Sequence, residues 1–195
     1  MLIAARYLVD RLREPRSRAD ELLRLRRQLT AQSTTSNATA EERQLALRMR
    51  DLRGQIAQAL GQVESCAHCA RGYAVPEGRW TGGHCCSGNT ADLFHHHEIA
   101  ALTLSGTGSS DLTPPGCDHA GCSFRGPTGC SLSPRHRPNV CIRYLCGELR
   151  AELAHRGDLA HVQSLVDDLE QTFDAFVAMR ATRLDSEELA ALFPA

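Results

Sequence analysis

The chain has 195 residues and a formal net charge of -1, with 42% hydrophobic, 23% charged and 5% aromatic residues. This length allows one compact unit or two small ones and excludes a large multidomain enzyme. The longest apolar runs are far shorter than the roughly 18 residues that a membrane-spanning helix needs. The N-terminal stretch is too short in apolar residues and too rich in arginine for a signal peptide, so we expect a cytoplasmic protein with no membrane segment.

Composition divides the chain into three segments. Residues 1–65 contain 12 Arg and 8 acidic residues, residues 66–146 contain all nine cysteines, and residues 147–195 contain 4 Arg and 10 acidic residues. The opposite charges of the two end segments predict that they pack on each other. Because the net charge of the whole chain is close to zero, we do not expect nucleic acid as a partner.

Apolar residues in the first segment have the spacing of a helical hairpin. Residues 31–38 are polar and predict the turn, and Thr39 and Glu42 have the spacing of a capping box at the start of the second helix. The hairpin is interpreted as a packing element, with a partner-docking or homodimerisation arm as the alternative. Its seams consist of Leu8, Leu12, Leu22, Leu25 and Leu29, and then Leu45, Met49, Leu52, Ile56, Ala59 and Val63.

The last segment repeats the helical pattern. Gly147 to His155 is rich in helix formers. Gly157 then predicts the end of that helix, and Asp158 predicts the start of the next one. A short terminal helix is expected over 186–192. The long helix between them carries Val162, Val166, Leu169, Phe173 and Phe176 on one seam. The expected fold class is therefore mainly α, with a helical hairpin and C-terminal helices framing an irregular cysteine-rich metal-binding module.

The middle segment is poor in large apolar residues. Only eleven of the 74 residues in 66–139 are Val, Ile, Leu, Met, Phe, Tyr or Trp. A segment of this kind is usually held together by disulfides or by a metal. Disulfides are disfavoured in a reducing cytoplasm, so metal coordination is the favoured interpretation.

The spacing of the cysteines supports a metal centre. Cys66 and Cys69 can reach one ion from a single turn, whereas the adjacent Cys85 and Cys86 point apart, which favours a binuclear or cluster site. Pro138 and Asn139 form a credible helix start that puts a cysteine in the first turn. The candidate ligands are Cys66, Cys69, Cys85, Cys86, Cys122, Cys130, Cys141 and Cys146.

These residues resemble the YkgJ-like cysteine-cluster proteins, a family with a zinc- or iron-chelating CxxCxxCC domain. The match covers 66–146 and consists of CAHC at 66, the pair at 85, Glu98, GCSF at 121, GCSL at 129 and RPNVCIRYLC at 137. Eight cysteines match in order, and the chain departs from the family by 15 residues between Cys69 and Cys85. The resemblance implies binding of zinc or an iron-sulfur cluster.

Several other residues have a simpler interpretation. Cys117 has no counterpart in the family and is expected to be an ordinary thiol. His95, His96 and His97 are adjacent, and consecutive helical residues diverge by about 100°, so we expect most of them in solvent on an amphipathic helix over 92–104. Phe94, Ile99 and Leu102 should face inward. Arg135, Arg137 and Arg143 are either neutralising partners of a thiolate cluster or surface residues.

No reaction is assigned from the sequence, because it contains no Walker loop, nucleophile elbow or HExxH motif. The first hypothesis is a binding module that holds zinc or an iron-sulfur cluster. The alternative is a metal-dependent modifying enzyme such as a protein lysine methylase. Some relatives are associated with lysine methylation of flagellin, but this chain has no glycine-rich cofactor-binding fingerprint that would carry that activity over. The two differ in whether a coordination position stays open.

Overall fold

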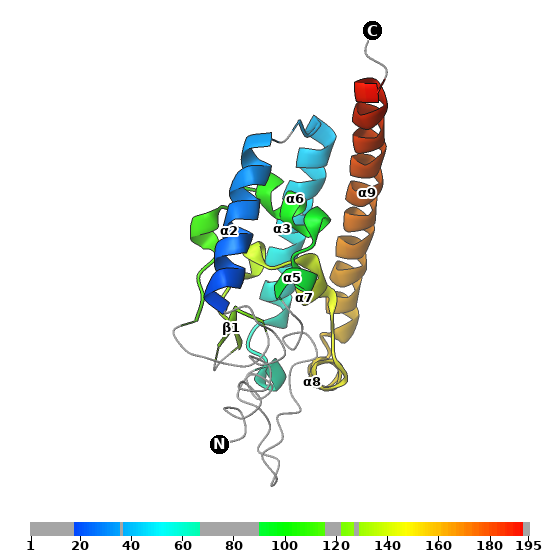
Figure 1. Ribbon diagram of the computed structural model, residues 1–195. Helices are drawn as coiled ribbons and strands as arrows, with labels where there is room; N and C mark the ends of the chain where they lie inside the picture. The colour runs from blue at the N-terminus through cyan, green and yellow to red at the C-terminus, as the bar shows by residue number, and fades with distance from the viewer. Residues whose placement is uncertain (1–17, 36, 67–89, 116–121, 127–128, 193–195) are drawn as a thin grey trace.

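The computed structural model describes residues 18–35, 37–66, 90–115, 122–126 and 129–192 (Figure 1). In these ranges the fold is mainly α, as predicted, and none of the helices is long and apolar enough to cross a membrane. The elements in chain order are α2 (Arg18–Thr35), α3 (Ala40–Leu60), α5 (Thr90–Leu93), α6 (His96–Leu104), the 3-10 helix η1 (Ser109–Asp111), β1 (Arg125–Gly126), β2 (Gly129–Cys130), η2 (Pro134–His136), α7 (Asn139–Arg143), α8 (Gly147–Arg156) and α9 (Leu159–Leu192).

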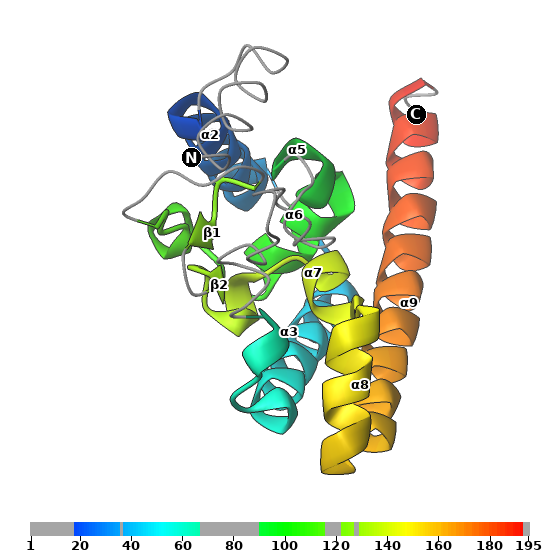
Figure 2. The same cartoon turned by 90° about the horizontal axis from the view of Figure 1, so that it is seen from below.

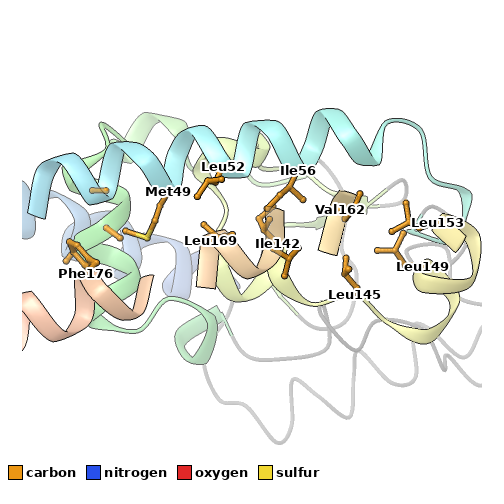
Figure 3. Packing of buried hydrophobic residues seen from close by; sticks show 14 residues of the cluster. Met49, Leu52, Ile56, Ile142, Leu145, Leu149, Leu153, Val162, Leu169 and Phe176 are labelled. Atoms are coloured by element: carbon orange, nitrogen blue, oxygen red, sulfur yellow. The ribbon is translucent and has the colours of Figure 1, made fainter. Parts of the chain in front are cut away.

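Helices α3 and α9 pack side by side, and the seams predicted on them meet in one core (Figure 3). Helix α3 begins where the capping box predicts: the Thr39 hydroxyl accepts the Glu42 N–H at 3.0 Å, and the Glu42 carboxylate accepts the Thr39 N–H at 3.2 Å. Side chains from α7 and α8 complete this core. Its labelled members are Met49, Leu52, Ile56, Ile142, Leu145, Leu149, Leu153, Val162, Leu169 and Phe176.

The contact between the two end segments is mainly apolar, and charge complementarity does not explain it. An ion pair that joins α3 to α9 has its acid, Glu42, on the N-terminal side and its base, Arg183, on the C-terminal side. The segment charges predict the reverse arrangement, with the base on the N-terminal side and the acid on the C-terminal side. Burial of the two seams therefore holds the ends together, because hydrophobic burial depends on area and not on net charge.

Helix α6 is the central helix of the described structure, which composition did not predict. It contacts α2 on one side and α3 on the other (Figure 2). A second core forms where α2 packs on it: Phe94, Ile99 and Leu102 are buried, as predicted. The other buried members of this core are Leu22, Leu25, Leu29, Leu112, Cys122, Phe124 and Leu132. The middle segment thus contributes apolar side chains to the core, although its average composition is poor in them.

Several predicted boundaries differ from the structure. Helix α3 ends at Leu60, before Val63 of its predicted seam, and the helix expected over 92–104 is divided into α5 and α6. Helix α2 continues to Thr35, inside the stretch predicted as a turn. The hydroxyls of Thr30 and Ser33 donate to carbonyl oxygens of the preceding helical turn, at 3.0 and 2.7 Å, and do not end the helix. The terminal helix expected over 186–192 is the end of α9. Ser186 does not cap a new helix; its hydroxyl donates to the Thr182 carbonyl at 2.8 Å and leaves the helix continuous.

Candidate metal centre

Five of the eight predicted ligands lie in the described ranges, on separate parts of the chain. Cys66 is exposed and Cys122 is buried, whereas the other three are half-buried: Cys130 in β2, Cys141 in α7 and Cys146 just before α8. Cys69, Cys85, Cys86 and Cys117 lie outside these ranges. Among the residues that the structure describes, no three Cys, His, Asp or Glu side chains are grouped so that they could hold a metal ion. The described thiols alone therefore do not make a closed site.

A buried carboxylate holds the start of the helix that carries Cys141. Glu98 of α6 accepts the backbone N–H of Asn139 at 2.9 Å, its side-chain amide at 3.1 Å and the backbone N–H of Val140 at 3.1 Å. These are the first two residues of α7, so Glu98 caps that helix across the fold. Burial raises the pKa of the Glu98 carboxyl, and the hydrogen bonds from Asn139 and Val140 oppose that shift.

An equally buried arginine completes this network. Arg53 of α3 donates from Nη1 to the Asn139 side-chain oxygen at 3.1 Å and from Nη2 to the Ser105 hydroxyl at 3.3 Å. Burial lowers the pKa of Arg53 to about 10, and the Glu98 carboxylate partly offsets this. Asn139 is therefore held from α3 and α6 together, and its amide oxygen and nitrogen are assigned by these opposite partners.

The two C-terminal cysteines are placed by two different short helices. Cys141 lies in the first turn of α7, as Pro138 and Asn139 predict. Cys146 is the N-cap of α8, and its sulfur accepts the Leu149 N–H at 3.5 Å. The chain between them leaves the helical conformation at Tyr144, so the two cysteines do not share a helix.

Cys122 and Cys130 flank a tight hairpin. The Arg125 N–H donates to the Cys122 carbonyl at 3.0 Å, and Arg125 pairs with Cys130 in the antiparallel β1–β2 ladder. Arg137 donates to the carbonyl oxygens of Leu132 at 2.9 Å and Cys130 at 3.4 Å. Arg137 therefore binds the backbone that carries a candidate ligand.

The other two arginines considered as charge-neutralising partners lie at the surface. Arg143 forms an ion pair with Glu170 of α9, and Arg135 is exposed. Their described positions agree with the simpler interpretation of them as surface residues.

Hydrogen bonds among three side chains, those of Glu21, Thr90 and Ser123, join α2 to the turn that follows Cys122. The Thr90 and Ser123 hydroxyls both lie within donating distance of one Glu21 oxygen, at 2.9 and 2.8 Å, and the Ser123 N–H donates to the Thr90 hydroxyl at 3.0 Å. Thr90 and Ser123 are buried. Thr90 follows Cys86 by four residues and Ser123 follows Cys122 directly. This cluster ties together two chain segments that lead to predicted ligands.

The histidine run is exposed or half-buried, as expected, but its rings lie closer together than helical geometry predicts. The His96 and His97 ring centroids are 3.9 Å apart, and His95 lies 6.1 and 6.2 Å from them. His95 precedes α6 with extended backbone, so the divergence of consecutive helical residues does not apply to it. The closest pair, His96 and His97, lies within α6, and its separation has no such explanation. The pKa of His97 is lowered to about 4. Burial is the largest cause, and the charge of the neighbouring His96 is the second.

No family model, curated protein or solved structure matches this chain.

The network of Arg53, Asn139 and Glu98 was not found by sequence reasoning as a unit. In the sequence, Glu98 is marked only by the family resemblance, and Arg53 is one of the 12 arginines of residues 1–65. A charged residue on the apolar seam of a helix is the signal that could have singled it out, because Arg53 lies next to Leu52 and three residues before Ile56.

Proposed function

We propose that this chain is a cytoplasmic metal-binding protein of the YkgJ-like family that holds zinc or an iron-sulfur cluster through Cys66, Cys69, Cys85, Cys86, Cys122, Cys130, Cys141 and Cys146. The donor set is all thiol, which suits zinc and iron-sulfur clusters and does not suit magnesium or calcium. A bound zinc would supply folding free energy on the order of 10 kcal/mol. A cluster would supply a redox centre instead.

The observation that carries the proposal is the anchoring of α7 by Glu98. Helix α7 has five residues, and a helix this short is not stable on its own. The fold fixes it with a buried carboxylate and a buried guanidinium, Glu98 and Arg53, although burying charged groups is energetically unfavourable. Cys141 is thereby held in a defined position, which is what a metal ligand requires.

A second observation supports sharing of one site by distant cysteines. The hydrogen bond from Ser123 to Thr90 joins the chain just after Cys122 to the chain four residues after Cys86. The predicted ligands Cys85 and Cys86 belong to the segment that leads into this contact. We expect these thiols to complete the coordination that the described cysteines leave open.

A third observation concerns the sulfur of Cys146. It accepts a backbone N–H from Leu149 at the start of α8, and hydrogen bonds to ligating sulfurs are a regular part of the surroundings of iron-sulfur and zinc sites. This contact supports the proposal that Cys146 is a thiolate ligand of a metal.

Single serine variants test the proposal, because a hydroxyl is a much poorer ligand than a thiolate for soft metal ions. Metal per chain is measured after anaerobic purification for Cys122→Ser, Cys130→Ser, Cys141→Ser and Cys146→Ser. Cys117→Ser is the matched control, five residues from Cys122. We expect metal loss in the four variants and full content in the control. Loss in the control together with retention in Cys122→Ser would refute the assignment of ligands.

A further inference from the structure

A pocket of about 420 Å³ lies between α2 and the α5–α6 turn, apart from the described cysteines. Volumes of this size are typical of small-molecule sites. Helix α2 lies beside α5 and α6 in both views (Figures 1 and 2). The apolar part of the lining is formed by Leu25, Ala31, Phe94 and Ile99.

The polar part of the lining is rich in hydrogen-bond donors. Arg24, Gln28 and Gln32 are spaced four residues apart on α2 and therefore lie in one row along the pocket. His95 and His96 line the opposite wall. Within the described part of the chain, the Arg24 guanidinium makes no hydrogen bond or ion pair.

The acidic group in the lining is already engaged. One oxygen of Glu21 lies 2.9 Å from the Thr90 hydroxyl and 2.8 Å from the Ser123 hydroxyl, which face it from the protein side. Two hydroxyl donors on one oxygen disperse the negative charge of this carboxylate. Arg24 is therefore the charge that a ligand would meet without a competing partner.

We propose that this pocket binds a small organic carboxylate, with the carboxylate on Arg24 and a short apolar chain over Leu25, Phe94 and Ile99. Arginine is suited to this role because its planar guanidinium can hold a carboxylate through two parallel hydrogen bonds. The apolar residues take the body of the ligand, and the glutamines and histidines supply adaptable polar contacts at the rim. The inference does not depend on metal binding.

Calorimetric titration of the full-length protein with three probes of equal length tests it: hexanoate, hexanol and hexylamine. We expect hexanoate to bind about tenfold or more tightly than hexanol, since a hydrogen bond to a charged group is worth more than one between neutral groups. Hexylamine should bind most weakly. Equal binding of the three probes, preference for hexylamine or no binding of hexanoate would overturn the proposal.

Variants of α2 show whether Arg24 is responsible for binding the carboxylate of hexanoate. Arg24→Gln should weaken hexanoate binding about tenfold, whereas Arg24→Lys, which keeps the charge, should restore part of it. The matched control is Arg27→Gln, which removes the same charge from an exposed position of the same helix outside the pocket. Thermal unfolding verifies that each variant is folded. Unchanged affinity in a folded Arg24→Gln variant, or equal loss in Arg27→Gln, would contradict the assignment.

Discussion

Glu98 and Asn139 are joined twice: one carboxylate oxygen of Glu98 accepts both the backbone N–H of Asn139, at 2.9 Å, and its side-chain amide, at 3.1 Å. The other oxygen accepts the N–H of Val140. This single side chain of α6 therefore determines where α7 begins. It thereby holds Cys141 in the first turn of that helix.

Replacing Glu98 by glutamine tests how much this cap contributes. An amide can accept only through its oxygen, and the change leaves the Arg53 guanidinium buried without its counter-charge. We expect Glu98→Gln to lower the free energy of unfolding by about 2–3 kcal/mol, measured by urea denaturation, and to reduce bound metal. The control Glu188→Gln, at an exposed position of α9, should change it by less than about 0.5 kcal/mol. Equal stability of both variants would contradict the role of Glu98.

The Thr90 cluster predicts a second stability effect. Thr90→Val keeps the shape of the side chain but leaves Glu21 with one hydroxyl donor fewer and the buried Ser123 N–H without an acceptor. We expect a loss of about 1–3 kcal/mol in the free energy of unfolding. Thr113→Val, at an exposed position, serves as the control. If Thr90→Val is as stable as the control, the cluster does not hold α2 to the Cys122 turn.

The contact between α3 and α9 should depend little on salt, because buried apolar side chains make up most of it. Ile56→Ala, at a fully buried position, should cost about 2–5 kcal/mol of unfolding free energy, whereas Leu47→Ala, at an exposed position of the same helix, should cost far less. The difference between these variants should be the same in low-salt and high-salt buffer. A cost for Ile56→Ala that falls steeply with added salt would show that charge, not burial, dominates the contact.

His97 predicts a dependence of stability on pH. Its pKa is lowered from 6.5 to about 4 in the folded chain, so the folded state disfavours the protonated ring. The stability that the neutral ring contributes is complete above pH 6.5 and is lost as the pH falls toward about 4. Because the ring is partly exposed, solvent screening limits the effect to about 1 kcal/mol or less.

Comparison of variants isolates this contribution from the protonation of carboxylates. Unfolding free energy measured across this pH range should fall less steeply in His97→Gln than in the unmodified chain. His161→Gln, on the exposed side of α9, should follow the unmodified chain. Parallel curves for all three proteins would rule out a specific contribution of His97.

The helices that sequence predicted best are those with a regular apolar seam. α3 and α9 place residues such as Ile56 and Val162 at helical spacing, and local periodicity is sufficient to identify such helices. The central position of α6 was not predicted, because the share of large apolar residues was averaged over the 74 residues of 66–139. That average conceals the short apolar run of this helix. The link of Arg53 to Asn139 was not predicted because it joins residues 86 positions apart, which no local pattern reveals.

The helix start at Pro138 was predicted, and with it the position of Cys141 in the first turn. Proline fixes its own backbone and lacks the N–H that a first helical turn would leave unpaired, so this signal is local. The grouping of the eight cysteines into sites is not local in this way. It remains a prediction from their number, their order and the family resemblance.

The most direct measurement of the central claim is the metal content and absorption spectrum of the unmodified protein after anaerobic purification. The proposal predicts either a colourless protein with stoichiometric zinc or a brown protein with iron and acid-labile sulfide. In both cases the metal should be released only with loss of folded structure near the cysteines. A protein that is fully folded with neither zinc nor iron, and that takes up neither on anaerobic reconstitution, would contradict the account.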